Sequence, residues 1–135
     1  MSVYIDTSAF YALASSSDVF HDSAKKIYQR LLQNNKHLIT TSYVLIETIA
    51  LIHRRLGFEV LETFVDSIQE VVEIIWVDKD LHEAGWKKLE TRRGKDDSLV
   101  DCVSFLAMHE KKIKEVFAND PHFKREGFIL QSGIG

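Results

Sequence analysis

Val3-Tyr4-Ile5-Asp6-Thr7-Ser8 is the stretch that decides the fold of this chain. Its three apolar residues form a short β-prone run that ends at an acid, and Thr7 and Ser8 then offer hydroxyls that favour a helix start. The stretch therefore predicts a buried strand that leads directly into a helix.

The same alternation of strand and helix continues along the chain. Further strands are predicted at residues 38–40, 71–77, 116–118 and 128–130, and helices at 18–32, 42–56, 59–67, 78–91 and 98–110, with a short helix from Pro121. Strands that alternate with helices form βαβ units with right-handed crossovers. The sequence thus predicts an α/β fold of three layers, with a central, mostly parallel five-stranded sheet between two layers of helices.

Two of these helices carry further signals. Ser42 is expected to cap the helix over 42–56, which Gly57 ends. The helix over 98–110 is apolar on most of its circumference, which predicts that it packs on several sides.

Length and composition narrow the class of protein. At 135 residues the chain has the length of one domain, so we expect residues 1–135 to form a single one. No apolar run approaches the roughly 20 residues of a membrane span, and no basic region precedes the first apolar run, so no membrane segment or signal peptide is expected. Cys102 is the only cysteine. A single cysteine excludes an internal disulfide, and Cys102 is expected to be a small core residue. Together with the lack of a signal peptide, it predicts a cytoplasmic protein.

The balance of charge restricts how this protein can bind nucleic acid. The formal net charge is -3, which excludes binding through a strong overall positive field. Any contact with phosphates must therefore be local. Basic residues do cluster, and Arg92, Arg93 and Lys95 are candidates for such contacts, although a solvated helix face explains a basic cluster as well.

Acidic residues stand where ligands bind in a parallel sheet. Asp6 and Asp120 each directly follow a predicted strand, and the carboxyl ends of such strands line the ligand site. Both also have a structural explanation, because each precedes a helix that an aspartate would cap. Asp101 has one too, since it stands at the capping-box position after Ser98. Taken singly, these three acids leave both interpretations open.

Glu47 is harder to explain as a structural residue. It lies within the predicted helix over 42–56, among neighbours that are nearly all apolar. A bare carboxylate would be costly to bury there. Glu47 is therefore expected to have a cation, a basic partner or a route to water.

Convergence of these four acids would imply a metal. Their mutual repulsion calls for a divalent cation, and oxygen ligands favour Mg²⁺ or Mn²⁺ over Zn²⁺. One or two such ions can activate a water and clamp a phosphodiester, so the set predicts hydrolysis of a nucleic-acid backbone. The six histidines are scattered and are expected to be surface or packing residues, with His122 of interest because it lies close to Asp120.

Four segments in order resemble the PIN-domain nucleases, and especially the toxins of VapBC-type toxin-antitoxin pairs. They are Tyr4-Ile5-Asp6-Thr7-Ser8-Ala9, Thr41-Ser42-Tyr43-Val44-Leu45-Ile46-Glu47, Asp97-Ser98-Leu99-Val100-Asp101-Cys102, and Phe117-Ala118-Asn119-Asp120-Pro121-His122-Phe123 followed by Gly127-Phe128. The resemblance covers nearly the whole chain. Many relatives carry threonine two residues before the last acid, where this chain has Ala118, which puts the strength of metal binding in doubt.

The resemblance implies a function and a site. Asp6, Glu47, Asp101 and Asp120 match the four acids that hold Mg²⁺ or Mn²⁺ in PIN domains, with Thr7 or Ser8 as a supporting hydroxyl and Asp97 and Asn119 as further supporting candidates. A polar loop explains Asp97 as well. The resemblance further implies a PIN-like fold, an RNA substrate, a homodimer, and a partner antitoxin that inserts near the acidic pocket.

Two other functions remain as alternatives. A metal-dependent phosphatase on a Rossmann-like fold would also use acids at strand ends, but one that forms an aspartyl-phosphate would want an acid at Ser8. The second is a non-catalytic PIN scaffold that binds RNA or protein, against which the four intact acids argue.

Overall fold

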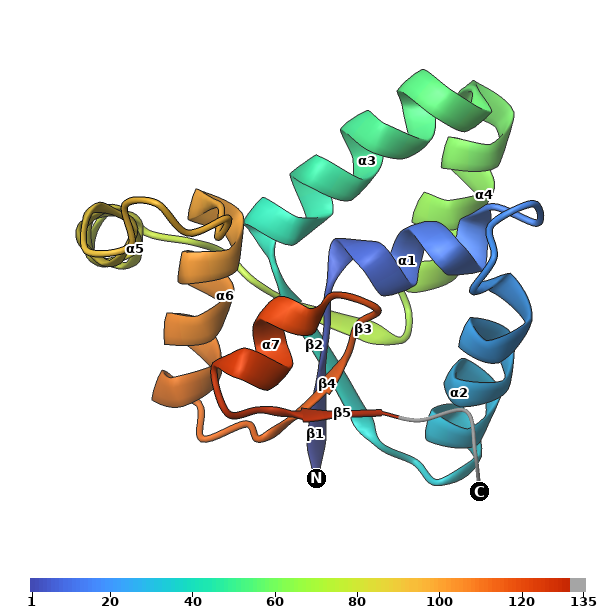
Figure 1. Ribbon diagram of the computed structural model, residues 1–135. Helices are drawn as coiled ribbons and strands as arrows, with labels where there is room; N and C mark the ends of the chain where they lie inside the picture. The colour runs from blue at the N-terminus through green and yellow to red at the C-terminus, as the bar shows by residue number, and fades with distance from the viewer. Residues whose placement is uncertain (132–135) are drawn as a thin grey trace.

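A computed structural model describes residues 1–131 of the chain (Figure 1). Within these residues the elements, in chain order, are β1 (Ser2–Ile5), α1 (Thr7–Ala14), α2 (His21–Gln33), β2 (His37–Thr41), α3 (Ser42–Leu56), α4 (Phe58–Ile68), β3 (Val72–Ile75), α5 (Lys79–Glu90), α6 (Leu99–Glu110), β4 (Glu115–Phe117), α7 (Pro121–Arg125) and β5 (Ile129–Leu130). Each predicted strand and helix is present, with ends that differ by up to three residues. The predicted helix over 18–32 starts later, at His21, because residues before it form turns.

The five strands form one sheet in the order β3-β2-β1-β4-β5, and all four pairings are parallel. Right-handed crossovers, the rule for parallel strands, place α1 to α4 on one face and α5 to α7 on the other. The helix contacts agree, because α1 packs on α2 and α3, while α5 packs on α6 (Figure 1). The prediction of a three-layer α/β fold is confirmed.

Strand β1 occupies the centre of the sheet, which explains its composition. Val3, Tyr4 and Ile5 are fully buried, as expected of a strand covered on both faces. On one face Phe10 of α1 meets Phe64 of α4 edge to face, and on the other Phe105 of α6 meets Phe123 of α7 in the same way. These aromatic contacts fix α1 and α7 over the two strand ends from which the acids Asp6 and Asp120 emerge.

Helix α3 has the predicted bounds but not the predicted cap. Thr41 is the N-cap residue, and its Oγ1 accepts a hydrogen bond from the Val44 backbone N–H at 3.3 Å. The Ser42 hydroxyl instead accepts from the backbone N–H of Val77 at 2.9 Å, so it links the start of α3 to the segment after β3. At the other end Gly57 has φ of +92°, a conformation that favours glycine.

Helix α6 is buried around most of its circumference, as its apolar composition predicted. Cys102, Val103 and Phe105 are fully buried, and the single cysteine is therefore a core residue. On its outer side α5 approaches closely at Gly85, where a Cβ would lie 2.5 Å from a methyl group of Val103. In the part of the chain described, no helix has both the length and the apolar character needed to span a bilayer.

Candidate active site

Asp6 stands between the end of β1 and the start of α1 and is almost fully buried. It caps α1, because its Oδ2 accepts hydrogen bonds from both the backbone N–H and the hydroxyl of Ser8, at 3.2 and 2.9 Å. Its own N–H donates to the carbonyl of Phe117 at the end of β4. The neighbouring strand β4 therefore fixes the position of this acid.

Ser8 connects Asp6 to the second strand end. Its Oγ donates to Asp6 and accepts from the backbone N–H of Asn119 at 2.9 Å. Asn119 immediately precedes Asp120, whose Oδ1 accepts from the His122 backbone N–H at 2.9 Å and so caps α7. The side-chain Nδ2 of Asn119 is buried and has no hydrogen-bond acceptor among residues 1–131. Of the two hydroxyls predicted to support the acids, Ser8 occupies that place.

Asp101 reaches the same region from α6. Its Oδ2 accepts from the backbone N–H of Ser98 at 3.0 Å, and its own N–H donates to the Ser98 hydroxyl at 3.1 Å, which completes the predicted capping box. The same Oδ2 lies 3.0 Å from His122 Nδ1. All three aspartates thus have the structural role that the sequence allowed: Asp6 and Asp120 are N-caps, and Asp101 is the N3 partner of the Ser98 cap.

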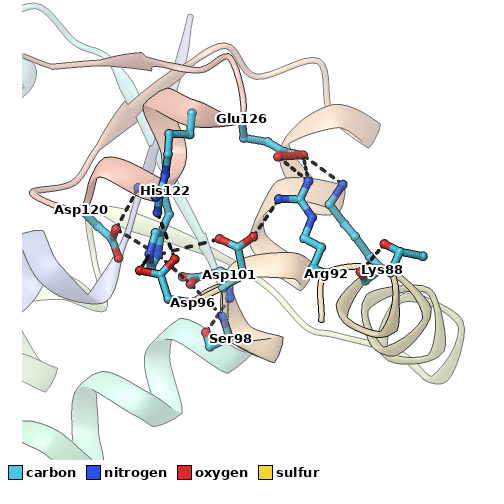
Figure 2. Close-up of polar contacts among 11 residues, drawn as sticks. Lys88, Arg92, Asp96, Ser98, Asp101, Asp120, His122 and Glu126 are labelled. Carbon is cyan, nitrogen blue, oxygen red and sulfur yellow. Dashed lines mark hydrogen bonds and ion pairs between the residues drawn. The ribbon is translucent and has the colours of Figure 1, made fainter. Parts of the chain in front are cut away.

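His122, which the sequence singled out only for its closeness to Asp120, lies at the centre of the cluster. Figure 2 shows its imidazole enclosed by carboxylates, with Nδ1 3.0 Å from both Asp101 Oδ2 and Asp120 Oδ1 and with Nε2 3.1 Å from Asp96 Oδ2. Its side chain is only 13% exposed. The signal available in the sequence was its position two residues after a strand-end acid, in the first turn of the helix that this acid caps.

The charges of this cluster are out of balance in the bare protein. Burial raises the pKa of Asp6 to about 7, and the carboxylates of Asp101 and Asp120 act in the same direction, against the hydrogen bonds from Ser8. Burial also raises the pKa of Asp101. Burial lowers the pKa of His122, but its contacts with three aspartates outweigh this effect, so that pKa lies above its usual value. Such a site gains free energy from added positive charge.

Glu47 has the route to water that the sequence left open, and Thr7 leaves the place beside Asp6 to Ser8. Glu47 is exposed on α3, so the argument that its burial would be costly does not apply, since water reaches it directly. It is absent from the groups of described residues whose ligand atoms lie within 4.8 Å of one another. The Thr7 hydroxyl lies 3.5 Å from the Val44 carbonyl and accepts from Thr48 at 3.2 Å, so it joins α1 to α3.

Beside the cluster, Arg92 joins three elements through ion pairs (Figure 2). Its Nη1 donates to Asp97 Oδ2 and its Nη2 to Glu126 Oε1, both at 2.7 Å, while Lys88 Nζ of α5 lies 2.9 Å from the same Glu126 oxygen. The Asp97 side chain is 6% exposed and that of Glu126 is 13% exposed. This network holds the loop before α6 against α5 and the end of α7.

A cleft of about 590 Å³ opens beside His122. Lys95 and Arg125 contribute basic side chains to it, and Asp96 and Asp97 contribute acids. Arg93 is exposed on the same loop. Arg92 also lines the cleft, but both of its terminal nitrogens already bind carboxylates.

Comparison with known proteins now identifies the family. The model of the PIN domain matches residues 3–129, which covers almost the entire described chain. The chain belongs to the PIN-domain family. This finding confirms the resemblance that the four ordered segments indicated, and the three aspartates that meet at the strand ends lie within those segments.

One relative is similar to this chain over nearly its full length. The chain is 30% identical over 128 residues to the 23S rRNA-specific endonuclease VapC20 of Mycobacterium tuberculosis. The aligned region covers 94% of this chain and 95% of the relative. The crystal structure of VapC20, described as a Sarcin-Ricin loop cleaving toxin, superposes with a TM-score of 0.83 at 31% identity, over 94% and 96% of the two chains.

More distant solved structures share the fold. VapBC2 of Rickettsia felis, solved with a fragment of promoter DNA, gives a TM-score of 0.72 at 18% identity, over 97% of this chain and 98% of that one. DNA-bound VapBC of Salmonella typhimurium gives 0.68 at 18% identity, over 98% of each chain. At this identity the two structures support the fold alone.

Proposed function

We propose that this protein is a metal-dependent RNA endonuclease of the VapC toxin type, formed as a single domain by residues 1–135. One observation carries the proposal: in a PIN-domain chain, the carboxylates of Asp101 and Asp120 converge on His122 beside the buried strand-end acid Asp6, whose pKa their charges raise. The similarity to a 23S rRNA-specific endonuclease supports RNA as the substrate class.

The donor set suits Mg²⁺ or Mn²⁺. Buried carboxylates with raised pKa values lack the positive charge that a divalent ion would bring. We assign Asp6, Asp101 and Asp120 as the residues that would hold it, with Glu47 as a fourth acid from α3. A bound ion of this kind supplies a Lewis acid that activates water and stabilises the phosphodiester transition state.

The remaining residues orient these acids and the RNA. Ser8 and the Asn119 backbone hold Asp6 and Asp120 together, while Ser98 fixes Asp101. The cleft beside His122 offers a path along which the RNA backbone would reach the acids.

The direct test is cleavage of a mixed RNA pool in Mg²⁺, Mn²⁺ or EDTA. We expect cleavage by the wild type with either metal, none in EDTA, and a loss of more than about 100-fold in Asp101→Asn and Glu47→Gln, because even residues that only support metal ligands contribute 10–100-fold. Cleavage that persists in EDTA, or full activity in both variants, would exclude the proposed mechanism.

Arg93 and Lys95 are the basic residues we assign to RNA phosphates. The double variant Arg93→Gln/Lys95→Gln, made in the Asp101→Asn background so that RNA stays uncut, should bind RNA more weakly. Its dependence of log K on log salt should be shallower by about 1.4, since each phosphate contact to a single strand contributes about 0.7. Lys26→Gln, an exposed change on α2, is the matched control. An unchanged slope would remove these two residues from the RNA path.

The alternatives are less well supported. An aspartyl-phosphate phosphatase would place an acid where Ser8 bridges Asp6 and Asn119 through its hydroxyl. A purely scaffolding role leaves unexplained why Asp101 and Asp120 converge on one histidine beside the buried Asp6.

The toxin role also implies partners. We propose a cognate antitoxin, in keeping with the similarity of the fold to solved VapBC proteins, and, from the family resemblance, a homodimer in the cytoplasm. A neighbouring gene for a short DNA-binding protein would favour the toxin role, whereas a lone gene would favour RNA processing.

A further inference from the structure

We propose that His122 is a nitrogen ligand of the divalent ion, alongside Asp101 and Asp120, and that the site therefore selects Mn²⁺ or a similar first-row transition ion over Mg²⁺. The inference rests on the proposed metal dependence, but it goes beyond the all-acid set that the sequence predicted. It concerns which atoms bind the ion and which ion is preferred.

The spacing of three donor atoms is the first argument. His122 Nδ1 lies 3.0 Å from Asp101 Oδ2 and 3.0 Å from Asp120 Oδ1. Adjacent ligands of an octahedral ion with bonds of about 2.1 Å lie about 3.0 Å apart. Donor atoms of these three residues also fall within 4.8 Å of one another, so one ion can contact all of them without a large rearrangement.

The other ring nitrogen gives the second argument. His122 Nε2 lies 3.1 Å from Asp96 Oδ2, and a histidine that binds a metal usually donates its second N–H to such a carboxylate. Metal binding would displace the proton that Nδ1 shares with Asp101 and Asp120, while Asp96 keeps the proton at Nε2, so that the freed Nδ1 lone pair can bind the ion. Figure 2 shows this arrangement, with Asp96 on one side of the ring and the two inner acids on the other.

The backbone fixes the ring in this place. His122 lies in the first turn of α7, between Pro121 at the helix start and Phe123, which is fully buried against Tyr4 and Phe105. Imidazole is a poor partner for Mg²⁺, which prefers oxygen, whereas first-row transition ions accept a nitrogen ligand among oxygens more readily, Mn²⁺ least strongly of them. The preference for the ion thus follows from one residue of α7.

Pulsed electron paramagnetic resonance on Mn²⁺ tests this directly. Mn²⁺ is added to the EDTA-stripped full chain, and the spectrum is examined for coupling to a directly bound ¹⁴N, first with unlabelled protein and then with ¹⁵N-histidine. We expect a ¹⁴N coupling that is replaced by a ¹⁵N coupling on labelling. Bound Mn²⁺ without nitrogen coupling, or a wild type that binds no Mn²⁺, overturns the inference.

Variants then assign the nitrogen to one histidine. His122→Gln should lose the coupling and weaken Mn²⁺ binding by about 10–100-fold, with a smaller effect on Mg²⁺. His53→Gln, an exposed change on α3, should alter neither. Coupling that survives in His122→Gln assigns the nitrogen elsewhere and refutes the proposal. Metal-dependent cleavage without nitrogen coupling rejects only this ligand, whereas coupling without any RNA cleavage rejects only the proposed function.

Discussion

Asp6→Asn is expected to abolish RNA cleavage while making the metal-free protein more stable at pH 8. Asparagine caps a helix about as well as aspartate, so the start of α1 should remain intact. The substitution removes a buried carboxylate that lies near Asp101 and Asp120, and with it one proposed metal ligand. We expect cleavage to fall by more than about 100-fold.

The effect on stability has a definite dependence on pH. Because burial raises the pKa of Asp6 from 3.8 to about 7, the folded state binds its proton more tightly than the unfolded state does. The free energy of unfolding of the wild type therefore falls as pH rises from about 4 to 7, and Asp6→Asn should lack this component. The upper limit of the difference above pH 7 is roughly 4 kcal/mol.

Thermal and urea unfolding in EDTA from pH 5 to 8 measure this difference. Asp78→Asn is the matched control, because Asp78 caps α5 in the same way but is exposed and lies outside the cluster. That variant should change neither cleavage nor the pH profile. Parallel stability curves for the wild type and Asp6→Asn would show that Asp6 carries no such strain in the fold.

Arg92→Met is expected to give the largest loss of stability among changes outside the core. Removing one partner of a fully buried ion pair costs about 3–5 kcal/mol, because a buried charge is left uncompensated. The Arg92 side chain keeps 19% exposure, and Lys88 still contacts Glu126. We therefore expect a loss of about 2–3 kcal/mol, most of it from the Asp97 carboxylate, which would keep only the longer contact of 4.0 Å with His122.

The free energies of unfolding of Arg92→Met and Arg93→Met, measured with urea, distinguish loss of the ion-pair network from the mere loss of one positive charge. Arg93 is exposed on the same loop, so its substitution should change the free energy of unfolding by less than about 0.5 kcal/mol. Arg92→Lys should fall between them, since lysine keeps the charge but lacks the fork that reaches Asp97 and Glu126 together. Equal stabilities for the two methionine variants would mean that the ion pairs do not stabilise the fold.

Local signals were sufficient for most of the fold. The apolar run before Asp6 and the glycine after Leu56 act on the chain segments next to them. Strand β1 and the end of α3 could therefore be predicted from sequence. The cap of α3 could not, because Thr41 and Ser42 both carry hydroxyls and only the contact between Ser42 and Val77 decides which one is free to cap. The ends of the other helices lie in turns, where apolar residues do not recur at a regular spacing, so the sequence pattern does not mark them.

The site was less accessible from sequence than the fold. Three aspartates could be proposed because they stand at strand and helix ends, but the place of Glu47 depends on how α3 sits on the sheet. Its neighbour Ile46 is 61% exposed, so apolar composition around Glu47 did not mean burial. His122 and the partners of Arg92 depend on contacts across the fold, such as that between Arg92 and Glu126, which local pattern does not encode.

Asp6 and Asp120 are helix caps as well as members of the acidic cluster, and this double role has a genetic consequence. A single G-to-A transition turns an aspartate codon into an asparagine codon, and asparagine fills the cap. Silencing mutations at these positions would thus leave a folded chain that persists in the cell. Such a chain would compete with active copies for RNA and for any neutralising partner. The mutant allele would therefore affect the wild-type protein in trans, beyond the loss of its own activity.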